Sequence, residues 1–179
     1  MKHFFLSDNH FKHANVIRYD NRPYETVEEM DADMIKKWNS VVGKDDIIWF
    51  LGDLSLSTNK EYLTKLIGSL NGRKRMVMGN HDNRKPRFYM DAGFEAVYDH
   101  PIVLLDYFIL SHEPLDYMGT ASPFYYIYGH IHNSTAYQTR TENSTCVCAC
   151  RHNYTPIEIP EFNERLHIVE EQLRNKKGE

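Results

Sequence analysis

Short apolar runs alternate with helix-like spacings of apolar residues along the first half of the chain. The runs at residues 4–6, 47–51 and 76–78 are continuous, as in strands buried on both faces of a parallel sheet. Between consecutive runs, apolar residues recur every three or four positions, which predicts a helix in each interval. This alternation of strands and helices is typical of a largely parallel sheet.

The two predicted helices share the same start signal. Thr26 and Thr58 each precede a glutamate by three residues, which is the pattern of a capping box. Gly43 and Gly72 come where the two helical patterns stop, as expected of residues that end a helix. A shorter helix is expected around residues 88–92.

The second half of the chain is predicted to be mostly β-structure. Six short runs with the composition of strands follow Glu95, at residues 97–98, 102–105, 108–110, 124–128, 136–139 and 145–149. A last helix is expected at 160–176, with an apolar stripe at Phe162, Leu166, Val169 and Leu173. The 179 residues fit one α/β domain, residues 1–179, in which two face-to-face mixed β-sheets are flanked by helices.

Five short motifs rich in His and Asp come at or just beyond the ends of apolar runs. They are Asp8-Asn9-His10, Gly52-Asp53, Gly79-Asn80-His81-Asp82, Ser111-His112 and Gly129-His130-Ile131-His132. Open α/β sheets place their sites at the carboxyl ends of strands, so we expect these motifs to meet. Together they offer more metal ligands than one ion can use, which makes a two-metal active site the leading hypothesis.

The candidate ligands are carboxylates, imidazoles and one amide oxygen, without a cysteine. They are Asp8, His10, Asp53, Asn80, His112, His130 and His132. This mixture of nitrogen and oxygen donors suits Mn, Fe, Zn or Ni better than a structural zinc or a calcium cage. Two ions about 3.5–4 Å apart would share a bridging carboxylate, expected to be Asp53, and a bridging hydroxide suited to attack on phosphorus.

In their order along the chain, the motifs resemble those of the calcineurin-like metallophosphoesterases, over residues 3–157. The resemblance implies a four-layer α/β/β/α sandwich. It also implies two overlapping ligand sets: Asp8, His10, Asp53 and His132 for one ion, and Asp53, Asn80, His112 and His130 for the other. His81 would then be a catalytic residue beside the substrate phosphate, where it stabilises charge or protonates the leaving oxygen.

A narrower likeness lies in residues 8–17 and the following Asn21-Arg22-Pro23, which are similar to a compact bacterial and phage branch of that family. The chain departs from this branch at Cys148 and Cys150, where related sequences tend to carry Gly and Asp. The departure affects no candidate metal ligand.

Several polar residues near the motifs are candidates for the substrate site. His13, Asn15, Arg22 and Arg84 are expected to contact substrate phosphate oxygens, although Arg84 also fits a solvated loop. Asp82 is a further catalytic candidate, which either orients His81 by accepting a hydrogen bond or caps the following turn. The aromatic run at 124–128 is interpreted as a core strand rather than a base-stacking surface.

Charge and cysteine content narrow the partners. The formal net charge of −4 gives no overall basic field for nucleic acid or an anionic membrane, so we expect no membrane partner. A small phosphorylated substrate is expected, with nucleotides among the candidates.

Cys146, Cys148 and Cys150 alternate on one strand face and are interpreted as packing rather than as a thiolate metal site. An odd cysteine count without a secretion signal indicates the cytoplasm.

The sequence therefore predicts a metal-dependent phosphoric ester hydrolase with a binuclear centre. Its substrate would be a phosphate mono- or diester, its nucleophile a metal-bridging hydroxide, and His81 would assist the leaving group. Two alternatives remain open at this point. One is a metal-dependent nuclease, which the acidic net charge disfavours. The other is a non-catalytic member of the fold that binds a protein partner, although no candidate ligand is missing. The oligomeric state is left open.

Overall fold

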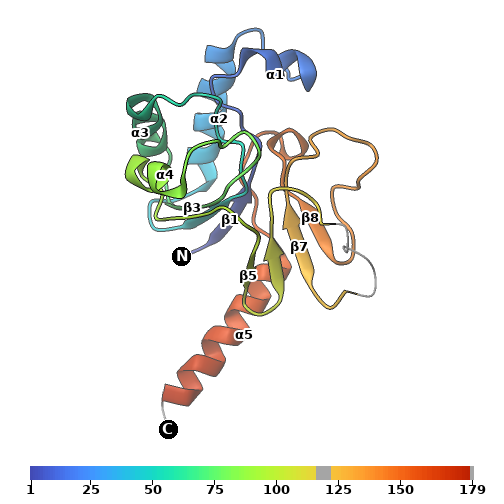
Figure 1. The fold of residues 1–179 in the computed structure, drawn as a ribbon. Coiled ribbons are helices and arrows are strands. Elements are labelled where there is room, and N and C mark those ends of the chain that lie inside the picture. Colours follow the sequence, from blue (N-terminus) through green and yellow to red (C-terminus); the bar gives the residue numbers. More distant parts are fainter. Residues whose placement is uncertain (116–121, 178–179) are drawn as a thin grey trace.

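Two four-stranded β-sheets lie against each other in the computed structural model, which describes residues 1–115 and 122–177 (Figure 1). The first sheet is entirely parallel and runs in chain order: β1 (His3–Leu6), β2 (Ile47–Phe50), β3 (Arg73–Val77) and β4 (Ala96–Tyr98). The second contains β5 (Ile102–Leu104), β6 (Phe108–Leu110), β7 (Tyr125–Tyr128) and β8 (Ser144–Cys146). In it, β5 and β6 are antiparallel, and the other pairs are parallel.

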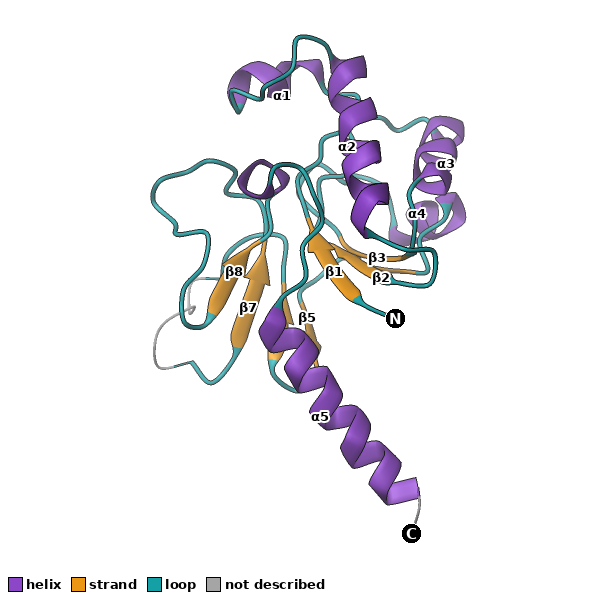
Figure 2. Ribbon diagram, turned by 180° about the vertical axis from the view of Figure 1, so that it is seen from behind, coloured by secondary structure: helices purple, strands orange, loops and turns teal. Residues whose placement is uncertain are grey.

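The helices are distributed unevenly around the sheets. They are α1 (Ala14–Tyr19), α2 (Val27–Val41), α3 (Lys60–Ser69), α4 (Pro86–Ala92), the 3-10 turn η1 (Ala149–His152) and α5 (Pro160–Lys177). Figure 2 shows α2, α3 and α4 on one side of the first sheet, while α5 extends away from the body of the molecule. Among the described helices, none is long and apolar enough to cross a membrane.

The predicted N-terminal cap is correct for α2 and wrong for α3. The Thr26 side chain accepts a hydrogen bond from the Glu29 backbone N–H at 3.1 Å, as the capping box predicts. The prediction that Thr58 caps the next helix is wrong, because α3 begins one residue later. Asn59 caps it by accepting from the Tyr62 N–H at 2.9 Å. Asparagine is at least as good a cap as threonine, so the neighbouring residue takes the position.

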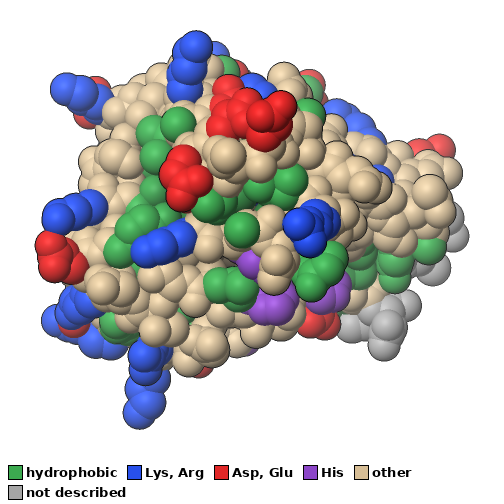
Figure 3. Space-filling model, turned by 90° about the horizontal axis from the view of Figure 1, so that it is seen from above, with side chains coloured by type: hydrophobic (Ala, Val, Ile, Leu, Met, Phe, Trp, Pro, Cys, Tyr) green, Lys and Arg blue, Asp and Glu red, His purple; other side chains and the backbone are tan. Residues whose placement is uncertain are grey.

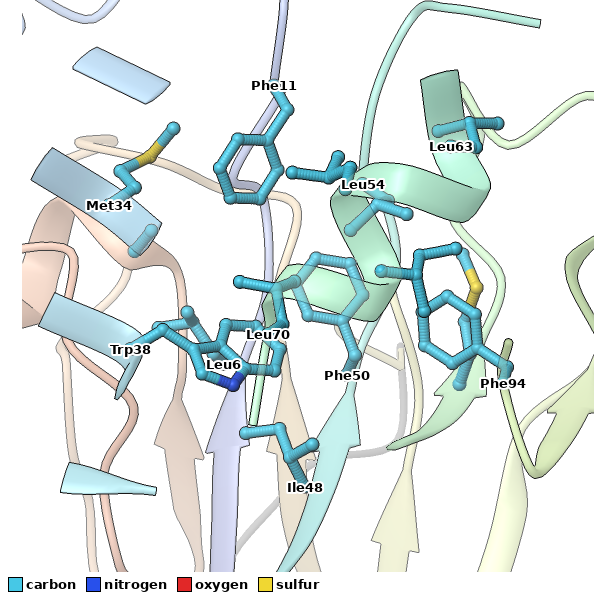
Figure 4. Close-up of a cluster of buried hydrophobic side chains, with 14 of the residues drawn as sticks. Leu6, Phe11, Met34, Trp38, Ile48, Phe50, Leu54, Leu63, Leu70 and Phe94 are labelled. Carbon is cyan, nitrogen blue, oxygen red and sulfur yellow. The ribbon is translucent and has the colours of Figure 1, made fainter. Parts of the chain in front are cut away.

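Alternation along the buried strands of the first sheet places one hydrophobic cluster on each of its two faces. Leu6 and Phe50 point from one face of the first sheet toward Met34 and Trp38 of α2 (Figure 4). Their strand neighbours, such as Phe5 and Trp49, face the second sheet. Both faces of this sheet are therefore apolar, which is why its strands read as continuous apolar runs.

Phe162 packs the start of α5 between the two sheets. Its ring centroid lies 5.0 Å from that of Phe5 and 4.9 Å from that of Phe108. Leu166 also contacts this cluster, but Leu173 is 54 % exposed, so only the first part of the predicted apolar stripe is buried. The rest of α5 projects beyond the sheets (Figure 1).

The predicted sandwich of two sheets with flanking helices is confirmed, with differences in detail. The first sheet is parallel rather than mixed. On the outer face of the second sheet, Tyr126 and Tyr128 pack against residues of loops such as Leu115, Phe124 and Ile131, and no described α-helix contributes to this cluster. A full outer helical layer is thus not part of the described structure.

The strand predicted at 136–139 is wrong, because the chain forms turns and bends there. The guanidinium of Arg151 donates to three backbone carbonyls in this region, those of His132, Ser134 and Tyr137. These bonds satisfy acceptors that a strand would satisfy through a ladder. The short helix α1 was not predicted from the sequence, and the other predicted elements are present with shifted ends.

Backbone hydrogen bonds join the two sheets along β1. Phe5 and Ile157 exchange N–H to carbonyl bonds of 2.8 and 3.0 Å, and Ser7 donates to the Val147 carbonyl at 3.0 Å. The end of β1 is therefore held beside the chain that leaves β8. The carboxyl ends of strands from both sheets consequently open toward the same side of the molecule (Figure 1).

Candidate metal centre

The five motifs converge at this shared edge of the two sheets. Asp8 and His10 follow β1, Asp53 follows β2, and the other ligand candidates follow β3, β6 and β7. Past the strand ends the backbone pairing continues, since Asp8 donates to the Gly52 carbonyl at 2.9 Å and His10 to the Asp53 carbonyl at 3.0 Å. Seen from above, the exposed histidine atoms gather in one place on this edge (Figure 3).

Four ligand candidates surround one position, which we call subsite A: Asp8, His10, Asp53 and His132. The His10 Nε2 atom lies 3.3 Å from His132 Nε2 and 3.6 Å from Asp53 Oδ2. The His132 Nε2 atom lies 3.5 Å from Asp8 Oδ1. When several donor atoms each bind the same ion at about 2.0–2.2 Å, the distances between those donor atoms are close to the values measured here. The four atoms are thus spaced as ligands of one cation.

A second group forms subsite B: Asp53, Asn80, His112 and His130. The His112 Nε2 atom lies 2.9 Å from Asn80 Oδ1, 3.2 Å from His130 Nδ1 and 3.5 Å from Asp53 Oδ2. The same carboxylate oxygen of Asp53 therefore lies within 3.6 Å of donors in both subsites. This is the position expected of a bridging ligand.

The hydrogen bonds of the Nδ1 atoms of two ligand candidates, His112 and His132, indicate whether the site fits a cation. The Nδ1 atom of His112 lies 2.7 Å from the Leu51 carbonyl, and that of His132 lies 2.6 Å from Asp20 Oδ2. In a neutral ring that donates through Nδ1, Nε2 carries a lone pair, which here faces carboxylate or amide oxygens that are themselves acceptors. The buried Oδ1 atom of Asp8 has no hydrogen-bond partner among the described residues. A divalent cation would satisfy all of these atoms, so the donor set fits one.

The electrostatics of the cluster favour bound positive charge. Burial lowers the pKa of His112, but the carboxylates of Asp53 and Asp8 outweigh it and raise the pKa to about 9. For His132, burial is likewise outweighed, chiefly by the hydrogen bond to Asp20, and the pKa rises to about 10. Burial raises the pKa of Asp53, yet His112 and its other partners lower it to about 2. His112 and His132 therefore hold their protons tightly, at the positions where a cation would bind.

Left-handed backbone is concentrated in the ligand loops. Five ligand candidates have positive φ angles: Asp8 (58°), His10 (51°), Asp53 (59°), His130 (70°) and His132 (44°). Such angles are uncommon outside glycine and accumulate at functional sites, where the surrounding structure imposes them. The unusual backbone conformation of these five residues thus helps to direct their side chains toward a common centre.

Two motif glycines leave the space that the ligand carboxylates occupy. A Cβ atom on Gly79 would lie 2.2 Å from Asp53 Oδ1, and one on Gly129 would lie 2.6 Å from Asp8 Oδ2. No other residue type fits these positions without displacing a carboxylate. The glycines therefore belong to the metal centre as much as the ligands do.

Arg22 is not available to the substrate, so its prediction as a phosphate contact is wrong. It is only 4 % exposed. Its guanidinium donates to the carbonyls of Asp8 and Asn9 at 2.8 and 2.7 Å, and to the Asp20 carboxylate at 3.1 Å. These bonds hold the loop after β1 and place Asp20 against His132. Asp20 was missed in the sequence, although a metal-binding histidine usually donates its second N–H to a carboxylate or carbonyl.

His81 lies beside subsite A without joining it. Its backbone N–H donates to Asp53 Oδ1 at 2.9 Å, and its exposed ring lies 5.4 Å from the ring of His10. Asp82 is buried, and its carboxylate accepts from the backbone N–H groups of Asp53, Gly79 and Leu54 at 2.6, 2.8 and 3.3 Å. Asp82 thus joins the loops after β2 and β3, a larger role than capping one turn, and its bonds are to backbone rather than to His81.

The remaining substrate candidates separate into two groups. His13 borders a cavity with His10, His81 and His132. Asn15 is exposed and borders a different hollow, beside Arg18 and Glu28. The Arg84 guanidinium is exposed and lies 5.7 Å from the centroid of the Phe88 ring. Of these three residues, His13 alone lines a cavity together with ligand candidates.

The aromatic run and two of the cysteines are core residues, as predicted. Tyr126 and Tyr128 are buried, and so are Cys146 and Cys148, whose Sγ atoms lie 3.3 Å apart. Cys150 is half-buried, and its Sγ atom, a carboxylate oxygen of Asp20 and a ring nitrogen of His132 all lie within 4.8 Å of one another. This last contact was not predicted.

Comparisons with known proteins agree with this geometry. The family model described as calcineurin-like phosphoesterase matches residues 1–148. The chain is 49 % identical over 88 residues to an uncharacterized protein of Methanocaldococcus jannaschii, a match that covers 49 % of this chain and 50 % of that protein. It is 44 % identical over 85 residues to the gene 66 protein of Mycobacterium phage L5, covering 46 % of this chain and 41 % of that one. The matches thus span about half the length of these curated relatives or less.

A solved structure shares the fold across nearly the whole chain. It is a protein of unknown function from Aquifex aeolicus, which superimposes with a TM-score of 0.69 at 24 % sequence identity. The alignment covers 90 % of this chain and 97 % of that one. At this level of identity the likeness concerns the fold alone.

Proposed function

Because the chain belongs to the calcineurin-like phosphoesterase family, we propose that it is a metal-dependent enzyme that hydrolyses a phosphate ester of a small molecule. The phage relative and the Aquifex structure support a compact phage and bacterial type of member. One observation carries the proposal: the Asp53 carboxylate oxygen lies 3.6 Å from His10 Nε2 and 3.5 Å from His112 Nε2, between two groups of ligands.

In the proposed centre, subsite A and subsite B each hold one divalent cation and share Asp53. When bound, such a pair supplies Lewis acidity, which lowers the pKa of water and neutralises charge on the phosphate oxygens. The donor set is compatible with Mn, Fe, Zn or Ni. Aspartate, asparagine and histidine from both sheets thus contribute to one reaction site.

His81 is the residue proposed to protonate the leaving oxygen. Its ring is exposed beside subsite A, and its backbone N–H is bound by Asp53, which supports a position near the substrate phosphate without a role as a ligand. A positioned general acid contributes about 10²–10⁴-fold to rate. Asp82 and Arg22 act on the reaction only indirectly, since both hold the loops that carry the ligands.

The proposed setting is the cytosol. The three cysteines are free thiols in the structure, which is compatible with a reducing compartment.

The first experiment supplies Mn, Ni and Zn in turn to the purified protein and measures bound metal together with hydrolysis of p-nitrophenyl phosphate and its bis ester. We expect two ions per chain and turnover of at least one ester. Asp53→Asn should lose both, because both subsites use this carboxylate, whereas exposed Asp45→Asn serves as the matched control. A protein that binds two ions but hydrolyses neither ester, nor any nucleotide or oligonucleotide, would instead be a binding scaffold.

A further inference from the structure

Two separate cavities flank the candidate metal centre. The first, here the His13 cavity, has a volume of about 220 Å³ and borders His10 and His132 of subsite A together with His13, Tyr19 and His81. The second, here the Pro101 cavity, has a volume of about 190 Å³ and borders Asn80 and His112 of subsite B. The two cavities share no lining residue. One cavity therefore borders ligand candidates of subsite A, and the other borders those of subsite B.

Their sizes suit two small groups rather than one large one. Pockets that hold a whole drug-sized ligand measure about 300–1,000 Å³, and each of these cavities is smaller. A single ring or sugar is the size that either would accept. A phosphate centred between the subsites would thus have room for an organic group on each side.

The His13 cavity suits an aromatic or other planar leaving group. Tyr19 is 76 % exposed at its edge, and its ring centroid lies 6.4 Å from that of His13 in an edge-on arrangement. His81, the proposed acid, borders the same cavity. The leaving oxygen is therefore expected on this side, next to the proton that it needs.

The Pro101 cavity suits an uncharged group. Met78, Pro101 and Leu115 supply apolar surface, and the lining includes two acidic residues, Glu113 and Asp99, the second beside His100. The extra negative charge of a phosphate monoester would be repelled by these acidic residues, whereas a neutral group with hydrogen-bond donors would not. This lining therefore favours a diester over a monoester.

We propose that the substrate is a phosphodiester whose leaving group occupies the His13 cavity and whose retained, uncharged group occupies the Pro101 cavity. The proposal rests on the proposed hydrolytic function. In the reaction, the oxygen of water forms a new bond to phosphorus, and the bond to the leaving ester oxygen breaks. That oxygen takes a proton from His81, water supplies the proton that restores His81, and the products are an alcohol or phenol and a phosphate monoester.

The test compares bis(p-nitrophenyl) phosphate with p-nitrophenyl phosphate, because both release the same leaving group. The metal-loaded protein is expected to favour the diester in kcat/KM by about tenfold or more. Glu113→Trp narrows the Pro101 cavity and Leu115→Ala removes part of its apolar wall, so each should lower the ratio of diester to monoester kcat/KM by about fivefold to tenfold. Glu142→Trp and Val103→Ala, at exposed positions that line neither cavity, are the matched controls.

The other cavity gives a different signature. Tyr19→Ala should lower kcat/KM for both probes by a similar factor of about fivefold to tenfold, because both place a nitrophenyl group there. Tyr137→Ala, at an exposed tyrosine that lines neither cavity, is its control.

Calorimetric binding of diphenyl phosphate provides a readout that does not depend on turnover. We expect its Kd to rise about tenfold in Glu113→Trp and in Tyr19→Ala, while phenyl phosphate binding is weakened by Tyr19→Ala alone. A wild-type preference for the monoester, or a ratio and a diphenyl phosphate Kd that neither Pro101-cavity variant changes, would overturn the proposal. If neither ester is hydrolysed, the proposed function fails, and diphenyl phosphate binding still decides whether the two cavities take two groups.

Discussion

His132 Nδ1 lies 2.6 Å from Asp20 Oδ2, although the two residues are 112 positions apart in the chain. The bond leaves the Nε2 atom of His132 directed at Asp8 and His10 in subsite A. A carboxylate behind a ligating histidine fixes its tautomer and its ring orientation and increases its basicity. Asp20 is in turn held by Arg22, so one buried arginine connects the loop after β1 to the ligand pair after β7.

Replacing Asp20 should weaken the metal centre without unfolding the protein. We expect Asp20→Asn to lower metal affinity by about 10–100-fold, the usual effect of losing such a partner. Competition with a chromogenic chelator measures this affinity, with Asp45→Asn as the control. An unchanged affinity would mean that His132 does not need the carboxylate for its orientation.

Arg22→Ala should destabilise the fold rather than impair substrate binding. The guanidinium is buried and bonded to Asp8, Asn9 and Asp20, and removing one partner of such a buried group costs about 3–5 kcal/mol. Urea unfolding of the metal-free protein measures the loss, and Arg18→Ala, at an exposed position, is the comparison. A raised KM with unchanged stability would restore the interpretation of Arg22 as a phosphate contact.

The metal-free protein should lose stability as the pH rises above neutrality. Although burial opposes it, carboxylate partners raise the pKa of His112 to about 9 and that of His132 to about 10 in the folded state. An unfolded histidine has a pKa of about 6.5. The stabilisation is therefore complete below about pH 6.5 and is lost as the pH rises through about 9 to 10. The same protons must leave when metal binds, so metal affinity should increase over this range.

The melting temperature of chelator-treated protein across this pH range checks the prediction. Burial lowers the pKa of His10 to about 4, so that residue changes charge only below the range. His112→Asn removes one of the two groups and should flatten the dependence. A melting temperature that rises with pH in the unsubstituted protein would contradict the assignment.

Gly79→Ala should abolish binding of metal. Its new methyl group would lie 2.2 Å from Asp53 Oδ1, so the bridging carboxylate must move. Gly68 in α3 is the matched control, because nothing lies within 4 Å of a Cβ atom there. Gly68→Ala should stabilise the protein by about 0.5–1 kcal/mol through helix propensity. Metal content and thermal unfolding of the two variants are the measurements, and a Gly79→Ala protein with full metal content would refute the close packing.

His81→Ala should reduce turnover while metal content stays the same. The loss should be about 10²–10⁴-fold for an ester with a poor leaving group, and smaller for p-nitrophenyl esters, whose leaving oxygen needs less protonation. His167→Ala on α5 is the control. An equal effect on good and poor leaving groups would argue for charge stabilisation instead of proton donation.

Local patterns were enough for the parts of this protein that depend on neighbours in the chain. The buried strands are recognisable because both of their faces are apolar, and α2 because Thr26 caps it as its spacing predicts. Even here, two adjacent cap candidates could not be ranked, and Asn59 rather than Thr58 begins α3. The strand expected at 136–139 failed for a longer-range reason, since Arg151 donates to the Tyr137 carbonyl within that segment and to the His132 and Ser134 carbonyls just before it.

By itself, the sequence determined the candidate ligands. Each motif contains residues whose side chains carry donor atoms, and each follows a strand whose end must lie at the sheet edge. Only the tertiary structure decided how the other polar residues are used. Arg22 is buried against Asp20, Asp82 binds backbone N–H groups, and Asn15 lies away from the centre. These outcomes depend on which loops the two packed sheets bring together, and contacts between residues 112 positions apart leave no trace in local spacing.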